Sequence, residues 1–336
     1  SLMYRAYYGV ADISTIKPNS KGVFTNAINA FARMINTLCK SEYDNMLVAF
    51  DAGKHTFRHE IFADYKAGRA HMPDEMRMQI AHIKNFLDIS GIKRFEIELY
   101  EADDIIGTLA RKAECEGYHV DIYSSDKDLL QLITDNTTVH LTKKGMTELE
   151  DFTPSYFEEV YDLKVNQFID LKALMGDKSD NISGVPGIGQ KKAVKYLKEF
   201  GSVEGILENT SSLKGKDKEN FELNRELALN CKKMVTILTD ANLPITLDDT
   251  KKGERDFDQL NDFYEYLELN MLLKDLRSQK PVNPVVTEFN YKYIEEIFKQ
   301  LINMGVKYLS VNFVFDINNT EIKHELKEGI NEVKTR

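Results

Sequence analysis

The sequence has few cysteines and no long hydrophobic run. Three cysteines occur in 336 residues, far apart and without a C-x-x-C pattern, so we expect neither a zinc knuckle nor a disulfide framework. A reducing, cytoplasmic setting is the default for such a chain. No apolar run reaches the roughly 18 residues that suggest a membrane helix. The first residues also lack the apolar stretch of a signal peptide, so no membrane association is expected.

Positive charge is also in short supply. The chain has 44 Lys and Arg residues against 54 Asp and Glu residues, which gives a formal net charge of −10. This value alone argues against nucleic acid as a partner, because phosphate binding requires a basic surface. Many of the acidic residues are clustered, however, in a way that is typical of a metal site, where bound cations reverse the local sign. The local arrangement must therefore decide the question.

Strand and helix patterns alternate through the first half of the chain. Short apolar or alternating runs predict strands over 46–50, 95–99 and 118–123. Apolar residues at helical spacing, or helix-like composition, predict helices over 22–38, 75–89, 102–115, 129–133 and 156–175. This alternation indicates an α/β domain with a mainly parallel central sheet flanked by helices. The length allows two or three domains.

The second half of the chain reads differently. A basic helix is predicted from 190 to 200, and residues 201–280 are mostly helical in pattern. The last segment contains one helix-like stretch at 291–302 and one strand-like stretch at 308–315, to which the sequence assigns no role.

Eight acidic residues fall into four groupings at corresponding places in the predicted α/β domain. They are Asp51; Glu101, Asp103 and Asp104; Asp126 and Asp128; and Asp177 and Asp180. Two groupings follow predicted strands, and a third begins a helix. Because ligands bind at the carboxyl ends of the strands in an open parallel sheet, we expect these carboxylates to gather at one edge.

Such a gathering requires positive charge to stabilise it. Glu101 and Asp104 are three residues apart, as are Asp177 and Asp180, so each pair shares a helical face. Carboxylates packed this closely repel one another and raise each other's pKa. Hard divalent cations bound by carboxylate oxygens are the natural compensation. Two such ions about 3.5–4 Å apart form the site type that hydrolyses phosphodiester bonds.

Each grouping taken alone has a simpler interpretation. Asp128 could be only a helix N-cap, and Asp177 or Asp180 could be simple loop carboxylates. A solvated acidic helix start explains the residues from Glu101 to Asp104 as well as a metal does. The occurrence of four groupings in one domain favours the metal interpretation.

A basic and aromatic stretch follows the first predicted strand. Lys66 and Arg69 are three residues apart and are predicted to share a helical face that holds phosphate, while Tyr65 stacks on a base. The alternative is a solvated surface helix with one buried tyrosine. His55 and His59 have the i, i+4 spacing of zinc ligands, but no third ligand pattern lies nearby.

A glycine-rich turn, 184–189, precedes the basic helix at 190–200. Glycines allow close backbone approach, and the N–H groups at the start of the helix form an anion site. A non-specific grip on a DNA backbone is therefore expected. Its residues are Gly184, Val185, Gly187, Ile188, Gly189, Lys191 and Lys192. A dinucleotide-binding loop is the competing interpretation, but it would need a preceding strand and an acidic residue about 20 residues further on.

Taken in order, these motifs resemble the 5′-nuclease domain of the bacterial DNA polymerase I family, within the flap endonuclease superfamily. The resemblance covers about residues 1–280. The matching pieces are 4–6 (Tyr-Arg-Ala), 48–52, 57–60 (Phe-Arg-His-Glu), 65–69 (Tyr-Lys-Ala-Gly-Arg), 100–104 (Tyr-Glu-Ala-Asp-Asp), 126–129, 176–181 and 184–189.

The resemblance implies a structure-selective 5′-3′ exonuclease and 5′-flap endonuclease, which hydrolyses DNA by two-metal-ion catalysis in replication and repair. All eight carboxylates match the metal site of the family, which implies two or more Mg²⁺ or Mn²⁺ ions. Tyr65, Lys66 and Arg69 match the phosphate-contacting positions of a helical arch. Arg5 matches a basic residue near the same phosphate, and Arg58 is expected to contact DNA.

The resemblance also implies a PIN-like or flap-endonuclease-like fold. Its parts would be a catalytic α/β domain (1–183) with an arch (53–90), a helical helix–hairpin–helix DNA-binding domain (184–280), and an extension of unknown role (281–336). A potassium ion at the glycine turn is expected. Expected partners are DNA with a 5′ flap, nick or 5′ end and the RNA primer strand of an RNA–DNA hybrid. We expect a bacterial cytoplasmic, nucleoid-associated monomer.

One departure leaves alternatives open. The family opens with a strand that carries an aspartate followed by a glycine, and this sequence starts after that point. Loss of that strand would weaken the metal site and expose a gap in the sheet. A catalytically impaired module that binds flap or junction DNA is therefore the alternative. A PIN-like ribonuclease is a third possibility, although the 65–69 motif and the glycine turn favour DNA.

Overall fold

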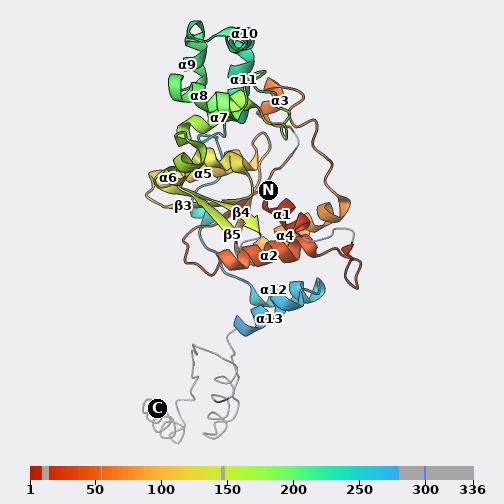
Figure 1. The fold of residues 1–336 in the computed structure, drawn as a ribbon. Coiled ribbons are helices and arrows are strands. Elements are labelled where there is room, and N and C mark those ends of the chain that lie inside the picture. Colours follow the sequence, from red (N-terminus) through yellow and green to blue (C-terminus); the bar gives the residue numbers. More distant parts are fainter. Residues whose placement is uncertain (10–14, 54, 145–147, 280–298, 300–336) are drawn as a thin grey trace, which may run out of the picture. The chain divides into compact units, whose positions relative to one another are not determined.

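A computed structural model describes residues 1–9, 15–53, 55–144, 148–279 and 299 (Figure 1). The chain divides into two units, Ser1–Leu273 and Lys274–Arg336. Apart from residue 299, the predicted stretches at 291–302 and 308–315 lie outside the described residues. Within the described residues, no helix combines the length and the apolar character needed to cross a membrane.

The strands form two small sheets. In the first, β1 (Leu47–Ala49) runs parallel to β2 (Lys93–Phe95), with Leu47 opposite Lys93. In the second, β3 (Val120–Ser124) runs parallel to β4 (Thr137–Lys144), which pairs antiparallel with β5 (Glu148–Phe152). The α/β class and the mainly parallel pairing are confirmed, but the strands do not form one continuous sheet.

A cavity of about 580 Å³ separates β1 from β3. Residues of both strands line it, together with apolar side chains of the neighbouring helices such as Phe31, Ile35, Ile106 and Leu109. Within the described residues, neither strand has a sheet partner on the side that faces the cavity. The sheet therefore has a gap between these two strands.

Helix α2 (Asn26–Leu38) packs against both α1 (Leu2–Tyr8) and α4 (Asp74–Ile89). Phe31 and Ile35 lie on the buried face of α2, as the helical spacing predicts. The side chain of Gln79 accepts hydrogen bonds from the N–H groups of Ala27 (2.8 Å) and Ile28 (3.1 Å). This contact satisfies donors in the first turn of α2, which have no partner within the helix.

The remaining helices complete the described part of the chain. They are α3 (Phe57–Ile61), α5 (Ala102–Cys115), α6 (Pro154–Tyr161), α7 (Phe168–Met175), α8 (Gln190–Phe200), α9 (Val203–Glu208), α10 (Gly215–Leu223), α11 (Arg225–Val235), α12 (Phe257–Tyr266) and α13 (Asn270–Gln279). Short 3₁₀ helices are η2 (Lys127–Leu132), η3 (Val165–Gln167), η4 (Thr210–Ser212) and η5 (Asp248–Thr250). Figure 1 shows α8 to α11 grouped beside α7.

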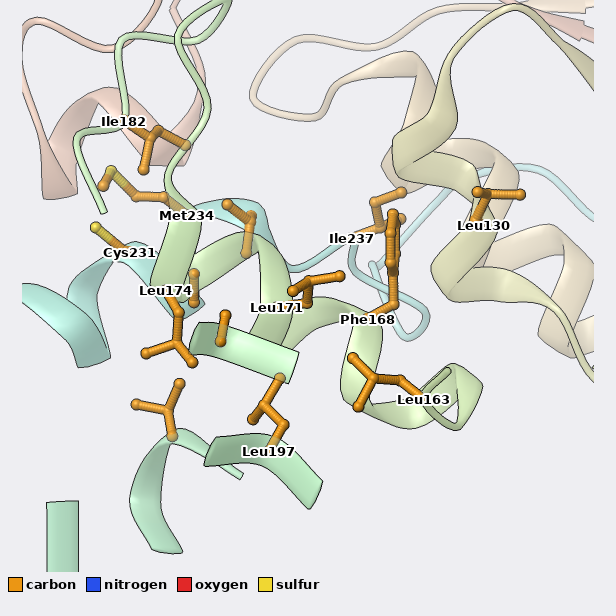
Figure 2. Packing of buried hydrophobic residues seen from close by; sticks show 14 of the residues in the cluster. Leu130, Leu163, Phe168, Leu171, Leu174, Ile182, Leu197, Cys231, Met234 and Ile237 are labelled. Carbon is orange, nitrogen blue, oxygen red and sulfur yellow. The ribbon is translucent and has the colours of Figure 1, made fainter. Parts of the chain in front are cut away.

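One hydrophobic core joins this helical group to the second sheet. Figure 2 shows Phe168 and Leu171 of α7 among residues that include Leu130 of η2, Leu197 of α8 and Met234 of α11. Because α7 contributes to both regions, its C-terminal end and the loop that follows are fixed relative to β3.

Several predicted elements differ from the structure. The helix predicted over 156–175 is broken at Asp162, whose left-handed backbone (φ 57°) ends α6. The strand predicted over 95–99 is β2, which lies at 93–95 and ends where that pattern begins. The helix predicted over 129–133 is the 3₁₀ helix η2. The strands β4 and β5 were not predicted.

Candidate active site

The first carboxylates meet at the start of α5. Asp51 lies just after β1, and its Oδ1 accepts a hydrogen bond from the N–H of Ala102 (2.9 Å). Glu101 is the N-cap residue, and its own N–H donates to Oδ2 of Asp104 (3.0 Å), as in a capping box. Acidic groups are stabilised here because the N-terminus of a helix carries partial positive charge.

Residues 64–69 fold onto the loop that carries Asp177 and Asp180. The N–H of Lys66 donates to the carbonyl of Asp180 (3.0 Å), and the side-chain amide of Asn181 donates to the carbonyl of Asp64 (2.8 Å). These residues form turns and not the predicted helix, and Lys66 has a positive φ of 59°. The turn, and not a helical face, brings the basic side chains to the carboxylates.

The side chains of this segment pair with Glu101 and Asp180. Lys66 Nζ lies 2.7 Å from Glu101 Oε2 and 3.9 Å from Asp180 Oδ2, and Arg69 Nη2 lies 2.5 Å from Asp180 Oδ1. The hydroxyl of Tyr65 donates to Asp180 Oδ2 at 3.0 Å. Two predicted phosphate-binding cations therefore hold two predicted metal carboxylates.

Tyr65 does not have its predicted role of stacking on a base. Only 4% of its surface is exposed, so a base cannot reach the ring. Burial and the nearby charges of Glu101 and Asp180 raise the pKa of its hydroxyl, which therefore remains a hydrogen-bond donor. The alternative of one buried tyrosine in this stretch matches the structure better.

A lysine that the sequence analysis missed joins two other groupings. Lys172 Nζ lies 2.7 Å from Asp128 Oδ1 and also pairs with Asp177 Oδ2. Burial opposes the charged form, but the two carboxylates raise the pKa of Lys172 above its ordinary value. The pKa of Asp177 is lowered to about 2, because hydrogen bonds from Lys172 and Ser179 outweigh burial. Lys172 is the one basic residue of the largely apolar helix α7, and this was the available signal.

The last three carboxylates have no such partner. Within the described residues, no Lys or Arg forms an ion pair with Asp51, Asp103 or Asp126. The pKa of Asp103 is raised to about 8, first by burial and then by the negative charges of Asp126 and Asp51. A bound cation would offset this repulsion and favour the ionised form of Asp103.

The donor chemistry of this region fits a hard divalent cation, because it consists of carboxylate oxygens. In the described part of the chain, however, no three Asp, Glu, His or Cys side chains converge to hold one ion. Side-chain cations hold Glu101, Asp128, Asp177 and Asp180 in this conformation. The groups that remain for a metal are Asp51, Asp103 and Asp126.

Arg58 and Asp104 adjoin Glu101 but do not face solvent. Arg58 is 2% exposed and Asp104 is fully buried. The two side chains form a bidentate ion pair with both N–O distances at 2.8 Å. The predicted contact between Arg58 and DNA therefore does not agree with the structure, because the guanidinium is inside the protein.

The glycine turn holds the carboxylate loop in shape. Gly184 has a φ of +66°, and a Cβ there would lie 2.4 Å from the backbone nitrogen of Gly176. This close approach accompanies two hydrogen bonds between the backbones of Asp177 and Ile182, both at 2.7 Å. Gly184 therefore positions Asp177, a role that its predicted DNA contact did not include.

The other residues of the turn divide into two sets. The side chains of Val185 and Ile188 are buried in the core, whereas Gly187, Gly189 and Lys191 are exposed. Lys192 is also exposed and pairs with Asp217 at 2.6 Å. A DNA backbone could reach the exposed set and the main chain, but not the two apolar side chains.

Helix α1 lies beside the site. Arg5 is half-buried on this helix. Burial and Tyr8 raise the pKa of the adjacent Tyr4, while the charges of Arg69 and Asp51 act on it in opposite directions. Tyr4 is thus within electrostatic reach of Arg69 and Asp51, and Arg5 is the next residue of the same helix.

Comparisons with known proteins match the whole of this region. Residues 1–162 match the family described as 5′-3′ exonuclease, N-terminal resolvase-like domain, and residues 163–258 match 5′-3′ exonuclease, C-terminal SAM fold. DNA polymerase I of Bacillus subtilis (strain 168) is 46% identical over 278 residues, which is 82% of this chain and 31% of that protein. DNA polymerase I of Bacillus caldotenax is 41% identical over 320 residues, 93% of this chain and 36% of that protein. The chain spans about a third of the length of these relatives.

Solved structures show a similar fold. T5 5′-exonuclease with bound divalent metal ions (zinc) has a TM-score of 0.55 and 27% identity, covering 74% of this chain and 89% of that chain. The catalytic core of Rad2 in complex with DNA substrate has a TM-score of 0.52 at 17% identity, covering 81% of this chain and 89% of that one. At that identity the likeness to Rad2 concerns the fold alone.

Proposed function

The chain belongs to the 5′-3′ exonuclease family, and from this premise we propose that it cleaves DNA at 5′ flaps and 5′ ends as a divalent-metal-dependent nuclease. The observation that carries the proposal is the contact between residues 64–69 and the carboxylates, in which Lys66 lies 2.7 Å from Glu101. Cations and carboxylates held this close together suit a reaction in which phosphate and metal ions meet.

Asp51, Asp103 and Asp126 do not converge in the present conformation, and they would turn toward one another to hold a Mg²⁺ or Mn²⁺ ion. Glu101, Asp128, Asp177 and Asp180 are the candidates for a second ion. Such ions would supply the positive charge and the activated water that phosphodiester hydrolysis requires. Lys66 and Arg69 exchange their carboxylate partners for the scissile phosphate when DNA binds. Arg5, on the neighbouring helix, approaches the same phosphate.

The substrate we propose is DNA with a 5′ flap, a nick or a 5′ end, including the RNA primer strand of an RNA–DNA hybrid. The metal-bound T5 5′-exonuclease, at 27% identity, is consistent with this class. The exposed backbone at Gly187 and Gly189, with Lys191, would grip the duplex, and its carbonyls would accept a potassium ion. We propose that the chain acts as a monomer on the bacterial nucleoid in the cytoplasm.

Cleavage of a 5′-labelled flap DNA tests the proposal. The reaction is run with Mg²⁺, with EDTA, and with the Glu101→Gln variant, beside an RNA flap of the same sequence. Metal-dependent cutting of DNA that is lost in the variant supports the proposal. Cutting that EDTA does not affect would contradict it, and preferential cutting of the RNA flap would favour a PIN-like ribonuclease.

A second candidate is a module that binds flap or junction DNA without turnover. It is favoured by the geometry of the carboxylates, because within the described residues no three of them converge to hold one ion. Intact binding of the flap DNA by the wild-type chain, with no product under any metal condition, would select this candidate.

A further inference from the structure

Arg58 and Asp104 are buried charged residues for which the proposed reaction has no use. Burying an ion pair removes both charges from water, which is costly unless the surrounding hydrogen bonds are complete. The two residues are 46 positions apart in the sequence and come from different helices, α3 and α5. Their contacts show what the pair does.

The hydrogen bonds to Asp104 use all of its capacity. Oδ1 accepts from Arg58 Nη2 (2.8 Å) and from the N–H of Leu238 (2.9 Å). Oδ2 accepts from Arg58 Nη1 (2.8 Å) and from the N–H of Glu101 (3.0 Å). A carboxylate has about four lone-pair sites, so none remains for a metal ion.

Arg58 also donates hydrogen bonds from each of its three side-chain nitrogens. Besides the two bonds to Asp104, its Nε donates to the carbonyl of Met234 (2.9 Å) and its Nη2 to the carbonyl of Thr236 (2.8 Å). Its Nη1 also lies 3.8 Å from the carboxylate of Glu101. The planar guanidinium fork suits this role, because it offers five donors in a fixed geometry.

We propose that Arg58 and Asp104 act as positioning residues, which fix Glu101 in place by joining the base of the arch, the start of α5 and residues 234–238. Asp104 then acts through Glu101 and does not bind metal itself. The inference rests on the proposed nuclease function for its effect on rate, but the buried contact can be tested without it.

A double-mutant cycle separates positioning from metal binding. Arg58→Ala, Asp104→Ala and the double variant are compared in single-turnover flap cleavage, well below the unfolding temperature of each. Each variant should lower kcat by about 10- to 100-fold, the scale on which a small displacement of a reacting group acts, with KM little changed. The double variant should be no worse than either single variant, because the two residues act as one unit.

The double variant also protects the test against misfolding, since it leaves no unpaired charge in the interior. Independent effects that multiply in the double variant would overturn the proposal, as would an unchanged kcat. The matched control is Arg94→Ala with Asp88→Ala, another bidentate pair, formed through Nε and Nη2 (2.9 and 3.0 Å) at a more exposed position. This control should leave kcat unaltered.

Amide hydrogen exchange provides a readout that does not depend on catalysis. The N–H groups of Glu101 and Leu238 both donate to Asp104, so both should be protected in the wild-type chain without metal or DNA. In the double variant both should lose protection, while amides of α8 keep theirs. Unchanged protection at Glu101 would refute the positioning role even if the wild-type chain cleaves, and lost protection would support it even if the chain does not.

Discussion

The carboxylates of this site form two groups, which differ in what offsets the repulsion between their negative charges. Glu101, Asp128, Asp177 and Asp180 are held by cationic side chains of the protein itself. Asp51, Asp103 and Asp126 have no such partner among the described residues, and the pKa of Asp103 rises to about 8. The first group is stable without a ligand, whereas the second lowers stability until a cation binds. The proposed metal-binding function therefore falls on the carboxylates whose charge the protein does not offset.

Removing a carboxylate from the second group should have the largest effect on rate. Asp103→Asn keeps the shape of the side chain but removes the carboxylate that is proposed to bind the cation, and we expect flap cleavage to fall by about 10³-fold, the upper range for loss of one stabilising group. Because the raised pKa of about 8 already leaves Asp103 largely protonated at neutral pH, the free energy of unfolding should not fall. Urea denaturation and single-turnover cleavage are the measurements, with the exposed Asp248→Asn as control. A lower free energy of unfolding for Asp103→Asn would contradict the distinction between the two groups of carboxylates.

Lys66→Ala removes a cation from the first group. Cleavage should slow by about 10²-fold, since this cation is proposed to stabilise charge on the phosphate. Lys66→Arg should recover part of the rate, and flap affinity measured in EDTA should change less than the rate does. An unchanged rate in the alanine variant would show that the 64–69 segment only stabilises the carboxylates.

Lys172→Met should lower the stability of the folded chain. The change leaves Asp128 and Asp177 without their shared cation in a largely buried setting. We expect the free energy of unfolding to fall by about 1–3 kcal/mol, the cost of an unpaired buried polar group. Added Mn²⁺ should restore part of this loss if the two carboxylates then bind the ion. Lys198→Met, at a more exposed pair with Asp162, is the control.

His140 extends the comparison to a cation that can lose its charge. Its Nδ1 lies 2.7 Å from Asp151 and its Nε2 lies 2.8 Å from Asp121, on the surface of the second sheet. Burial opposes protonation, but the hydrogen bonds to both carboxylates raise the pKa of His140 above 6.5. Its contribution to stability is therefore complete below pH 6.5 and is lost as the pH rises through the raised value.

The size of this effect should be the smallest of the four. Both carboxylates are about half exposed, so we expect the loss to be below about 1 kcal/mol. Urea denaturation from pH 5.5 to 8.5 compares the wild-type chain with His140→Asn, whose stability should not show this step. An identical pH profile in the two proteins would show that protonation of His140 does not contribute to stability.

The strongly periodic elements could be predicted from the sequence. Helix α4 begins and ends within a residue of its predicted bounds, because Met76, Ile83, Phe86 and Leu87 repeat at helical spacing. The strand at β4 was missed because its Thr, Lys and His residues carry little hydrophobic signal. At 156–175 the helical composition continued through Asp162, where one left-handed residue ends the helix.

The residues of the candidate site could be selected from the sequence, but the ion pairs between them could not. The order of the motifs was enough to select the carboxylates and the 64–69 segment. It did not reveal which cation holds which carboxylate, because Arg58 and Asp104 meet across 46 positions and Lys172 meets Asp128 across 44. Such partners are decided by tertiary packing, which turned a predicted metal ligand and a predicted DNA contact into a buried pair.

The cavity between β1 and β3 has a consequence for the timescale of backbone motion. The N–H of Phe50 bonds to Phe95 and that of Val120 to Asn136, so along each strand alternate amides face a sheet partner and the intervening ones, such as those of Ala49 and Tyr123, face the cavity. In deuterated solvent the two sets should therefore exchange at different rates, fast and slow in alternation. Such alternating exchange would show that β1 and β3 are each unpaired on one side, as edge strands are, although both lie within the domain.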